Sequence, residues 1–408
     1  MWELIRVNKR NSVILLVSMA AVLILLGFFI GASVGGFETA YWGIMIATGI
    51  WLLLSIISFT SGDQILLSSS RAVPITHSVH PQLFNVVEEM TIAAGLNKVP
   101  KVYIINDPAL NAFATGRSPQ DASIAITAGL LGKLNRDELQ GVIAHEMSHI
   151  VHRDILFITL AGIMLGSIVL LSQVFMRGLY YRGSGRRYSS GGRGGGGGGG
   201  AVAILVVIAI IAAILAPIMA QILYFALSRK REYLADAGSA RLTRYPEGLA
   251  SALEKIAADS APQLASANKV NAPMFITNPF KKKMGLSSER LYSTHPPIQE
   301  RIKILRNMSG ASYSDYSKAY SNTTGHRTIV PPSALTPEEV AIREASEKQV
   351  REEKKEKQMH QVADIMRKVN GFIFLTCLCG LNLKIPPNFN RPAVNCPRCH
   401  RELQIPKS

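Results

Sequence analysis

The stretch GVIAHEMSHI, residues 141–150, holds two histidines four positions apart, His145 and His149, with Glu146 directly after the first. Positions four apart share one face of a helix, so both rings could reach a single metal ion. Zinc lowers the pKa of coordinated water to about 7, and a neighbouring carboxylate can accept its proton. The spacing therefore predicts a zinc peptidase site, although the same letters also occur by chance on helices that only pack.

A catalytic zinc usually takes three protein ligands, so a third must come from elsewhere in the chain. We predict Glu232, in SRKREYLADAGSARL, because Asp236 follows one helical turn later and could accept the second ring N–H of a ligand histidine. The alternative is an ordinary exposed acidic pair on a basic helix. His152 is closer in sequence to the two histidines than Glu232 is, but its spacing from them argues against a role as a ligand.

Long apolar segments surround these residues. A helix needs about 20 apolar residues to cross a bilayer. Four segments without any charged residue meet this length, and they cover residues 12–35, 41–59, 155–175 and 201–227. We interpret the first as a retained anchor rather than a cleaved signal, because a second span follows at once. The last two segments separate His149 from Glu232 and would form a hairpin, which returns both ligands to one side of the membrane.

The chain has a formal net charge of +16, from 44 basic and 28 acidic residues. We attribute this excess to contact with lipid and expect no nucleic-acid partner. The positive-inside rule predicts a cytoplasmic N-terminus, because Arg6, Lys9 and Arg10 precede the first span and the first connection has no lysine or arginine. The protein is then a multi-pass protein of the inner membrane with its catalytic part in the cytoplasm. Arginines within 177–193 oppose this orientation, so the last two segments could instead dip in without crossing.

The polar parts predict the rest of the fold. Residues 79–96 form an amphipathic helix, and KVYIIND, NAFATG and SIAIT form three short strands. A helix begins after Asn135, whose side chain and Glu138 can form a capping box. We therefore predict a mainly α protein with a small β-sheet. It comprises a transmembrane hairpin (1–60), a zincin-type α+β domain (61–310) interrupted by a second hairpin (155–227) with a glycine-rich loop (177–200), a linker (311–370) and a small C-terminal module (371–408).

Two features of the C-terminal part support these last divisions. Thr336-Pro337-Glu338-Glu339 is a strong helix start, so we expect one charged helix over 336–369 as a spacer. All four cysteines of the chain follow it, in two close pairs: Cys377 with Cys379, and Cys396 with Cys399. Four thiolates in this arrangement predict a structural zinc ribbon in a reducing compartment. Its expected task is docking of a partner or a substrate.

Several motifs together resemble the HtpX-like membrane zinc metalloproteases: NAFATG, NRDELQGVIAHEMSHI, RKREYLADAGSA and STHPPIQERI occur in that family's order. The resemblance implies a zinc bound by His145, His149 and Glu232, with Glu146 as the general base and damaged or surplus membrane proteins as substrates. It also implies that an edge strand holds the substrate backbone, that a histidine stabilises charge at the scissile carbonyl, and that an arginine supports the site. These residues are Asn111, Ala112, Phe113 and Ala114 for the strand, His295 for the histidine, and Arg301 for the arginine.

Two other functions share part of this pattern. A membrane-anchored scaffold would recruit partners through the ribbon while the zinc site stayed idle. A CAAX-type processing protease would use the same chemistry on prenylated substrates. Such an enzyme would enclose a larger helical chamber, and the four predicted spans count against it.

Overall fold

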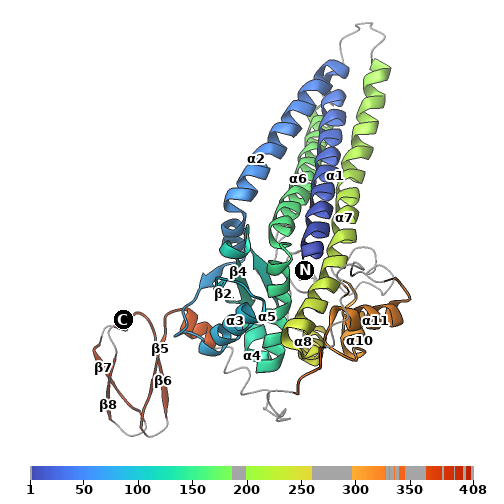
Figure 1. Ribbon diagram of the computed structural model, residues 1–408. Helices are drawn as coiled ribbons and strands as arrows, with labels where there is room; N and C mark the ends of the chain where they lie inside the picture. Colours follow the sequence, from blue (N-terminus) through green and yellow to red (C-terminus); the bar gives the residue numbers. More distant parts are fainter. Residues whose placement is uncertain are drawn as a thin grey trace.

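The computed structural model of the chain describes residues 2–185, 199–259, 296–327, 330, 335, 340–344, 364–378, 381–389, 391–397 and 401–405. Four long helices form a bundle above a smaller α+β body, and two β-hairpins lie beside that body (Figure 1). The bundle helices are α1 (Trp2–Gly35), α2 (Phe37–Ser69), α6 (Ile155–Gly185) and α7 (Gly199–Thr243). Within the described residues these four are long and apolar enough to cross a membrane, as the sequence predicts.

Small residues let the first two bundle helices approach closely. A Cβ atom built on Gly43 of α2 would lie 2.1 Å from the backbone oxygen of Gly27 on α1, and one built on Gly31 would lie 2.7 Å from the oxygen of Thr39. Glycines at such crossings allow backbone contact where lipid supplies no hydrophobic driving force between helices. The bundle is thus a packed unit, and its apolar outer surface suits lipid.

The body contains a four-stranded sheet in the order β1-β2-β4-β3. Its strands are β1 (Ala72–Pro74), β2 (Lys101–Ile105), β3 (Ala112–Thr115) and β4 (Ser123–Thr127). A 3-10 turn at Pro119–Asp121 precedes β4. The pairing β2–β4 is parallel and the other two pairings are antiparallel. The three strands predicted from sequence are confirmed, whereas the short β1 escaped prediction because three residues ending in proline carry almost no pattern.

Alternate residues of strand β4 pack against two different parts of the protein. Ile124 and Ile126 face the main core, which the helices fill, while Ala125 between them packs against Leu66 and Leu67 at the end of α2. This period of two is the ordinary consequence of strand geometry. Because one face covers the body's core and the other receives a bundle helix, the sheet connects the two parts of the protein.

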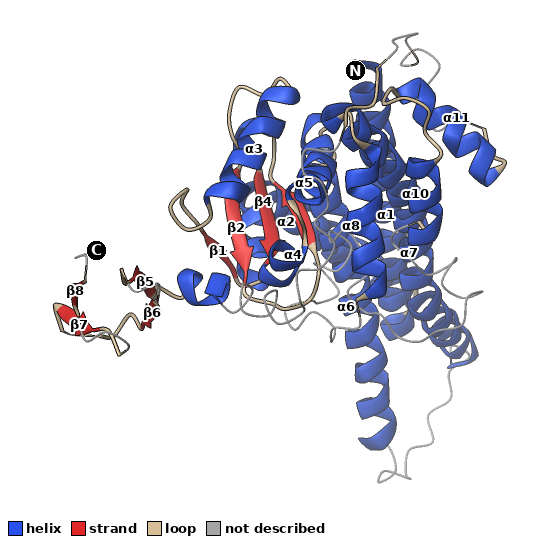
Figure 2. Cartoon of the chain, turned by 90° about the horizontal axis from the view of Figure 1, so that it is seen from below, coloured by secondary structure: helices blue, strands red, loops and turns tan. Residues whose placement is uncertain are grey.

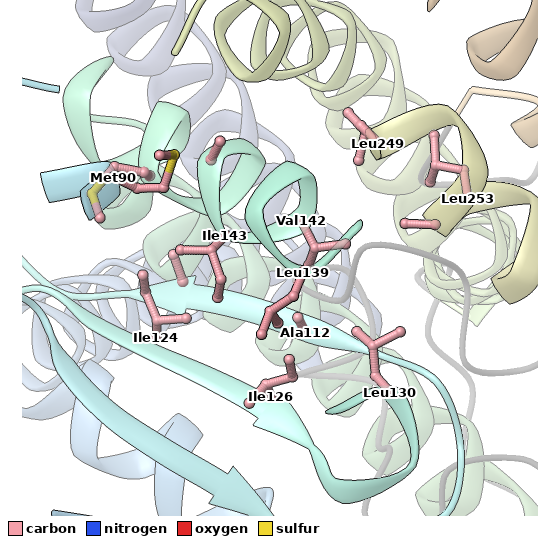
Figure 3. Packing of buried hydrophobic residues seen from close by; sticks show 14 of the residues in the cluster. Met90, Ala112, Ile124, Ile126, Leu130, Leu139, Val142, Ile143, Leu249 and Leu253 are labelled. Carbon is pink, nitrogen blue, oxygen red and sulfur yellow. The ribbon is translucent and has the colours of Figure 1, made fainter. Parts of the chain in front are cut away.

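Helix α5 (Arg136–Val151) occupies the centre of the body, between the sheet and α8 (Pro246–Ala258) (Figure 2). The predicted capping box is confirmed, because the Asn135 side chain accepts from the Glu138 backbone and the Glu138 carboxylate accepts from the backbone N–H of Asn135. Figure 3 shows Leu139, Val142 and Ile143 packed between strand residues and α8. The surrounding helices are α3 (Pro81–Ala93), α4 (Ala128–Lys133), α10 (Ile298–Arg306) and α11 (Tyr313–Thr324).

The lower end of α7 crosses α5 at very short range. A Cβ on Gly238 would lie 1.9 Å from the Ser148 hydroxyl oxygen and 2.9 Å from its Cβ, so only glycine fits at this crossing. One residue further, the Ser239 hydroxyl donates a 2.7 Å hydrogen bond to the backbone oxygen of Gly141. The crossing therefore fixes the position of the α7 residues that precede Gly238, among them Glu232 and Asp236.

The segment after α11 differs from the expected spacer helix. Residues 340–344 are not helical and run along the body, and helix is present only over 364–369; residues 336–339 and 345–363 lie outside the described part. The Arg343 guanidinium donates to Asp137 (2.8 Å) and Gln140 (2.7 Å) of α5, and to the Thr243 backbone oxygen (3.0 Å). The prediction of a helix through 340–344 is wrong because these contacts outweigh local helix propensity.

The C-terminal module consists of two antiparallel hairpins. One pairs β5 (Ile373–Thr376) with β6 (Asn382–Ile385), and the other pairs β7 (Ala393–Asn395) with β8 (Glu402–Gln404). Cys377 follows β5 and Cys396 follows β7, so each begins the turn of its hairpin, and both are buried. Cys379 and Cys399 lie outside the described residues.

Replacing Gly238 with alanine should lower the thermal unfolding midpoint of the detergent-solubilised protein. Overpacking a close contact costs about 1–3 kcal/mol, and here the new methyl group would meet Ser148. The matched control is Gly178→Ala in α6, where an added Cβ meets nothing within 4 Å. Circular dichroism should show a lower midpoint for Gly238→Ala alone; equal midpoints would contradict the tight crossing.

Replacing Arg343 with alanine should also lower the unfolding midpoint. The change removes the charge-assisted hydrogen bond that Asp137 accepts from Arg343, and because the Asp137 side chain is only 6% exposed, its loss should cost about 1–3 kcal/mol. Arg327→Ala is the control, since that residue is exposed. If both variants unfold at the wild-type temperature, residues 340–344 do not brace the body.

Candidate metal centre

Three buried side chains bring their ligand atoms together beneath the bundle. One atom each of His145, His149 and Glu232 lies within 4.8 Å of the others. Glu232 Oε2 is 3.6 Å from His145 Nε2, and Glu232 Oε1 is 3.6 Å from His149 Nε2. The two rings are edge to face, with centroids 4.9 Å apart. Among the described residues this is the cluster of histidine, cysteine and carboxylate groups that could hold a metal ion.

The donor set fits zinc. Two imidazole nitrogens and one carboxylate oxygen match the three-ligand catalytic sites that leave a position open. His145 Nε2 is fully buried and makes no hydrogen bond within the described part of the chain. A buried polar atom without such a bond is costly unless something else satisfies it. A metal ion between the three side chains would satisfy this nitrogen.

A carboxylate supports the first histidine from behind. His145 Nδ1 lies 3.0 Å from Asp236 Oδ1, and Asp236 is fully buried on α7. The Arg301 guanidinium of α10 donates two hydrogen bonds to Asp236, of 2.8 and 2.7 Å, and its Nη1 is 3.4 Å from Glu232 Oε2. Burial alone would lower the pKa of His145, but the carboxylates of Asp236 and Glu232 raise it to about 9. This placement agrees with the supporting roles expected of Asp236 and Arg301.

The second histidine has a supporting carboxylate that the sequence prediction missed. His149 Nδ1 lies 3.4 Å from Asp154 Oδ2, and Asp154 is 1% exposed. Asp154 lies five residues after His149, just before α6 begins. The sequence did offer one signal for this role, namely an acidic residue between the predicted metal-binding helix and the next membrane span. A carboxylate in such a place needs a partner.

Glu146 faces the same region from α5 and is 2% exposed. Burial raises the pKa of its carboxyl group, while the charges of His145 and His149 and a hydrogen bond with the Ala114 backbone oppose this rise. Ala114 belongs to β3, the edge strand next to α5. The structure therefore places the predicted substrate strand beside the predicted base, and Asn111 is buried at the start of that strand, before Ala112 and Phe113.

Two further histidines, His152 and His295, bear on the predicted site. His152 has its ring nitrogens 3.2 Å from the Ser148 hydroxyl and 3.2 Å from the Tyr313 hydroxyl, and it is outside the ligand cluster. Burial lowers its pKa to about 4, so the ring is neutral at pH 7. His295 lies outside the described residues, which begin again at residue 296 and include Arg301.

Comparisons with known proteins agree with this site. Residues 77–309 match Peptidase family M48. A "Protease HtpX homolog" of Dictyoglomus turgidum is 45% identical over 307 residues, which cover 75% of this chain and 94% of the relative. Its counterpart in Caldanaerobacter subterraneus subsp. tengcongensis is 43% identical over 311 residues, or 76% and 98% of the two chains.

A solved structure, that of S. mikatae Ste24p, has a TM-score of 0.38 and 19% identity, with coverage of 75% of this chain and 67% of the other, which is too low to support an argument. The family match and the two bacterial relatives are sufficient by themselves. They agree with four membrane-length helices and with a buried cluster of two histidines and a glutamate. The chain belongs to peptidase family M48 and is a membrane-bound zinc metalloprotease.

Proposed function

We propose that this protein is an endopeptidase that cleaves membrane or misfolded proteins, with zinc held by His145, His149 and Glu232 and with Glu146 as the general base. One observation carries the proposal: two histidines of α5 and a glutamate of α7 bring buried ligand atoms within 4.8 Å of one another. Two imidazoles and a carboxylate whose ligand atoms converge in a buried place form the donor set of a catalytic zinc site.

Each residue has a part in the reaction. When bound, zinc supplies Lewis acidity, which polarises the peptide carbonyl and makes water a stronger nucleophile at neutral pH. The Glu146 carboxylate takes the proton of the attacking water and passes it to the leaving amine. Its buried position favours proton uptake, since burial raises its pKa. Asp236 and Arg301 hold His145 and Glu232 in place.

Substrate backbone would align along β3 at the end of the sheet, through Asn111, Ala112, Phe113 and Ala114. Addition of an extended peptide to a sheet edge supplies affinity through main-chain hydrogen bonds. The position of β3 at the end of the sheet order, next to α5, supports this mode. His295 would stabilise the negative charge that develops on the scissile carbonyl oxygen.

We further propose that the body faces the cytoplasm from the inner membrane. The N-terminus lies at the body's end of the bundle (Figure 1), and Arg6, Lys9 and Arg10 are close to it in sequence. Positive residues favour the cytoplasmic side. The proposed metal ligand Glu232 lies on α7, the helix that also contains a membrane-length apolar segment. This location favours substrates that lie in or near the bilayer.

Glu146→Gln should keep the zinc and abolish proteolysis. Glutamine has the same shape but cannot accept the proton, and loss of a general base costs roughly 10²–10⁴-fold in rate. Cleavage of an unfolded reporter protein in detergent measures the rate, and metal analysis measures the zinc. Glu88→Gln, at an exposed position of α3, is the control and should cleave as the wild type does. Normal cleavage by Glu146→Gln would refute the assigned base.

The C-terminal hairpins form the second part of the proposal. Cys377, Cys379, Cys396 and Cys399 would bind a structural zinc that holds a module too small for its own core. The support is that Cys377 and Cys396 are buried at equivalent positions, each at the start of a hairpin turn. This ribbon would dock a substrate or a partner protein.

Purified protein should therefore contain two zinc ions, and Cys396→Ser should contain one. His400→Ala is the matched control and should keep both, since four cysteines already complete a tetrahedral site. Metal analysis of the three proteins gives the stoichiometry. Loss of both ions in Cys396→Ser would contradict an independent ribbon.

A further inference from the structure

Asp154 is a buried carboxylate at the junction between the metal-binding helix and the second membrane hairpin. It is 1% exposed, and its backbone N–H donates a 2.9 Å hydrogen bond to the His149 backbone oxygen. The preceding residue, Arg153, has a φ of 58°, in the left-handed region. This turn aims the Asp154 side chain back toward α5 instead of continuing the helix.

Three elements meet at this carboxylate. Its Oδ2 lies 3.4 Å from His149 Nδ1 on α5. Its Oδ1 accepts a 2.8 Å hydrogen bond from the Asn8 side chain on α1, and the same oxygen is 3.7 Å from Arg231 Nε on α7. With Oδ1 bonded to the Asn8 amide and close to the Arg231 guanidinium, Oδ2 is directed at the histidine.

The arrangement matches the one around the other histidine. His145 Nδ1 faces Asp236, which accepts two hydrogen bonds from Arg301. In both cases a carboxylate lies behind the ring, and a donor from a different helix fixes that carboxylate. A carboxylate behind a ligand histidine fixes its tautomer and orientation and raises its basicity.

We infer that Asp154 is the positioning residue of His149, and that Asn8 makes the first membrane helix a part of the metal centre by holding Asp154. The inference rests on the proposed zinc ligation by His149. Asp154 keeps the proton on Nδ1, so that Nε2 presents its lone pair toward Glu232 and His145. Asn8 restrains Asp154 from the far side.

The surroundings of Asn8 support this role. Asn8 is 7% exposed at the base of a helix that is otherwise mostly apolar. A buried amide is costly unless it is hydrogen-bonded, and Asp154 supplies the bond. One turn later, the Ser12 hydroxyl accepts a 3.0 Å hydrogen bond from Arg231. Helix α1 therefore also contacts α7 close to Asp154.

Four variants test the inference: Asp154→Asn, Asn8→Leu, the double variant, and Ser18→Ala as the control on the same helix, since the Ser18 hydroxyl donates to the Ile14 backbone oxygen of that helix. Zinc affinity is measured by competition with a chromogenic chelator in detergent, and the unfolding midpoint of the metal-free protein is measured in parallel. His149→Ala identifies the catalytic binding phase, because it removes that phase and leaves any ribbon phase.

Asp154→Asn should weaken zinc binding in the catalytic phase by about 10–100-fold, the usual effect of removing a group that orients a metal ligand. Asn8→Leu should weaken it by up to about tenfold, and the double variant should bind no more weakly than Asp154→Asn, because both act through one carboxylate. Ser18→Ala should keep wild-type affinity.

Two results would overturn the inference. The first is wild-type zinc affinity in Asp154→Asn, whatever its unfolding midpoint; a lowered midpoint beside it would mean that Asp154 only stabilises the corner between α5 and α6. The second is an additive loss in the double variant, which would mean that Asn8 acts elsewhere. If His149→Ala removes no binding phase, the proposed ligand set fails instead, and this outcome is distinct from the other two.

Discussion

The close crossing of α7 over α5 at Gly238 is the constraint on which the metal centre depends. His145 and His149 are on one helix, but Glu232 comes from a helix that follows an entire membrane hairpin. Its carboxylate reaches the histidines only because α7 descends within contact distance of Ser148, where any Cβ would collide. Glu232 and Asp236 lie on the same helix as Gly238, so the crossing sets both the ligand and the carboxylate behind His145.

Burial of so many ionisable groups requires that they partner one another. Glu232, Asp236, Asp154 and Arg301 are all nearly inaccessible to solvent. Isolated charges in such a place would cost many kcal/mol, whereas a network in which each carboxylate meets a histidine or a guanidinium can be tolerated. Arg301 is central to this balance, since it contacts both Asp236 and Glu232. The packing of α10 on the body therefore serves the electrostatics of the site as well as the core.

Sequence reasoning reached the features that depend on local spacing. The i, i+4 pair on α5, the capping box at Asn135 and three strands of the sheet were predicted, and Glu232 was placed because two spans return the chain to the same side. Features that depend on distant contacts were missed. The role of Asp154 requires Asn8, which lies 146 residues away in the chain. Residues 340–344 are not helical because Arg343 contacts Asp137, a contact over 206 residues that no local pattern contains.

The membrane bundle is more than an anchor for the body. One of its helices, α7, runs without interruption from a membrane-length apolar segment to the residue that completes the metal cluster. Another, α1, contributes Asn8 at the base of the bundle. The sheet in turn packs one face against the end of α2. Because these contacts reach the ligands and the sheet through buried groups, a relative movement of the bundle helices would disturb the ligand geometry. The site is thus built jointly by the membrane bundle and the body. A soluble fragment without the bundle would lack both the helix that carries Glu232 and the hydrogen bond from Asn8 to Asp154.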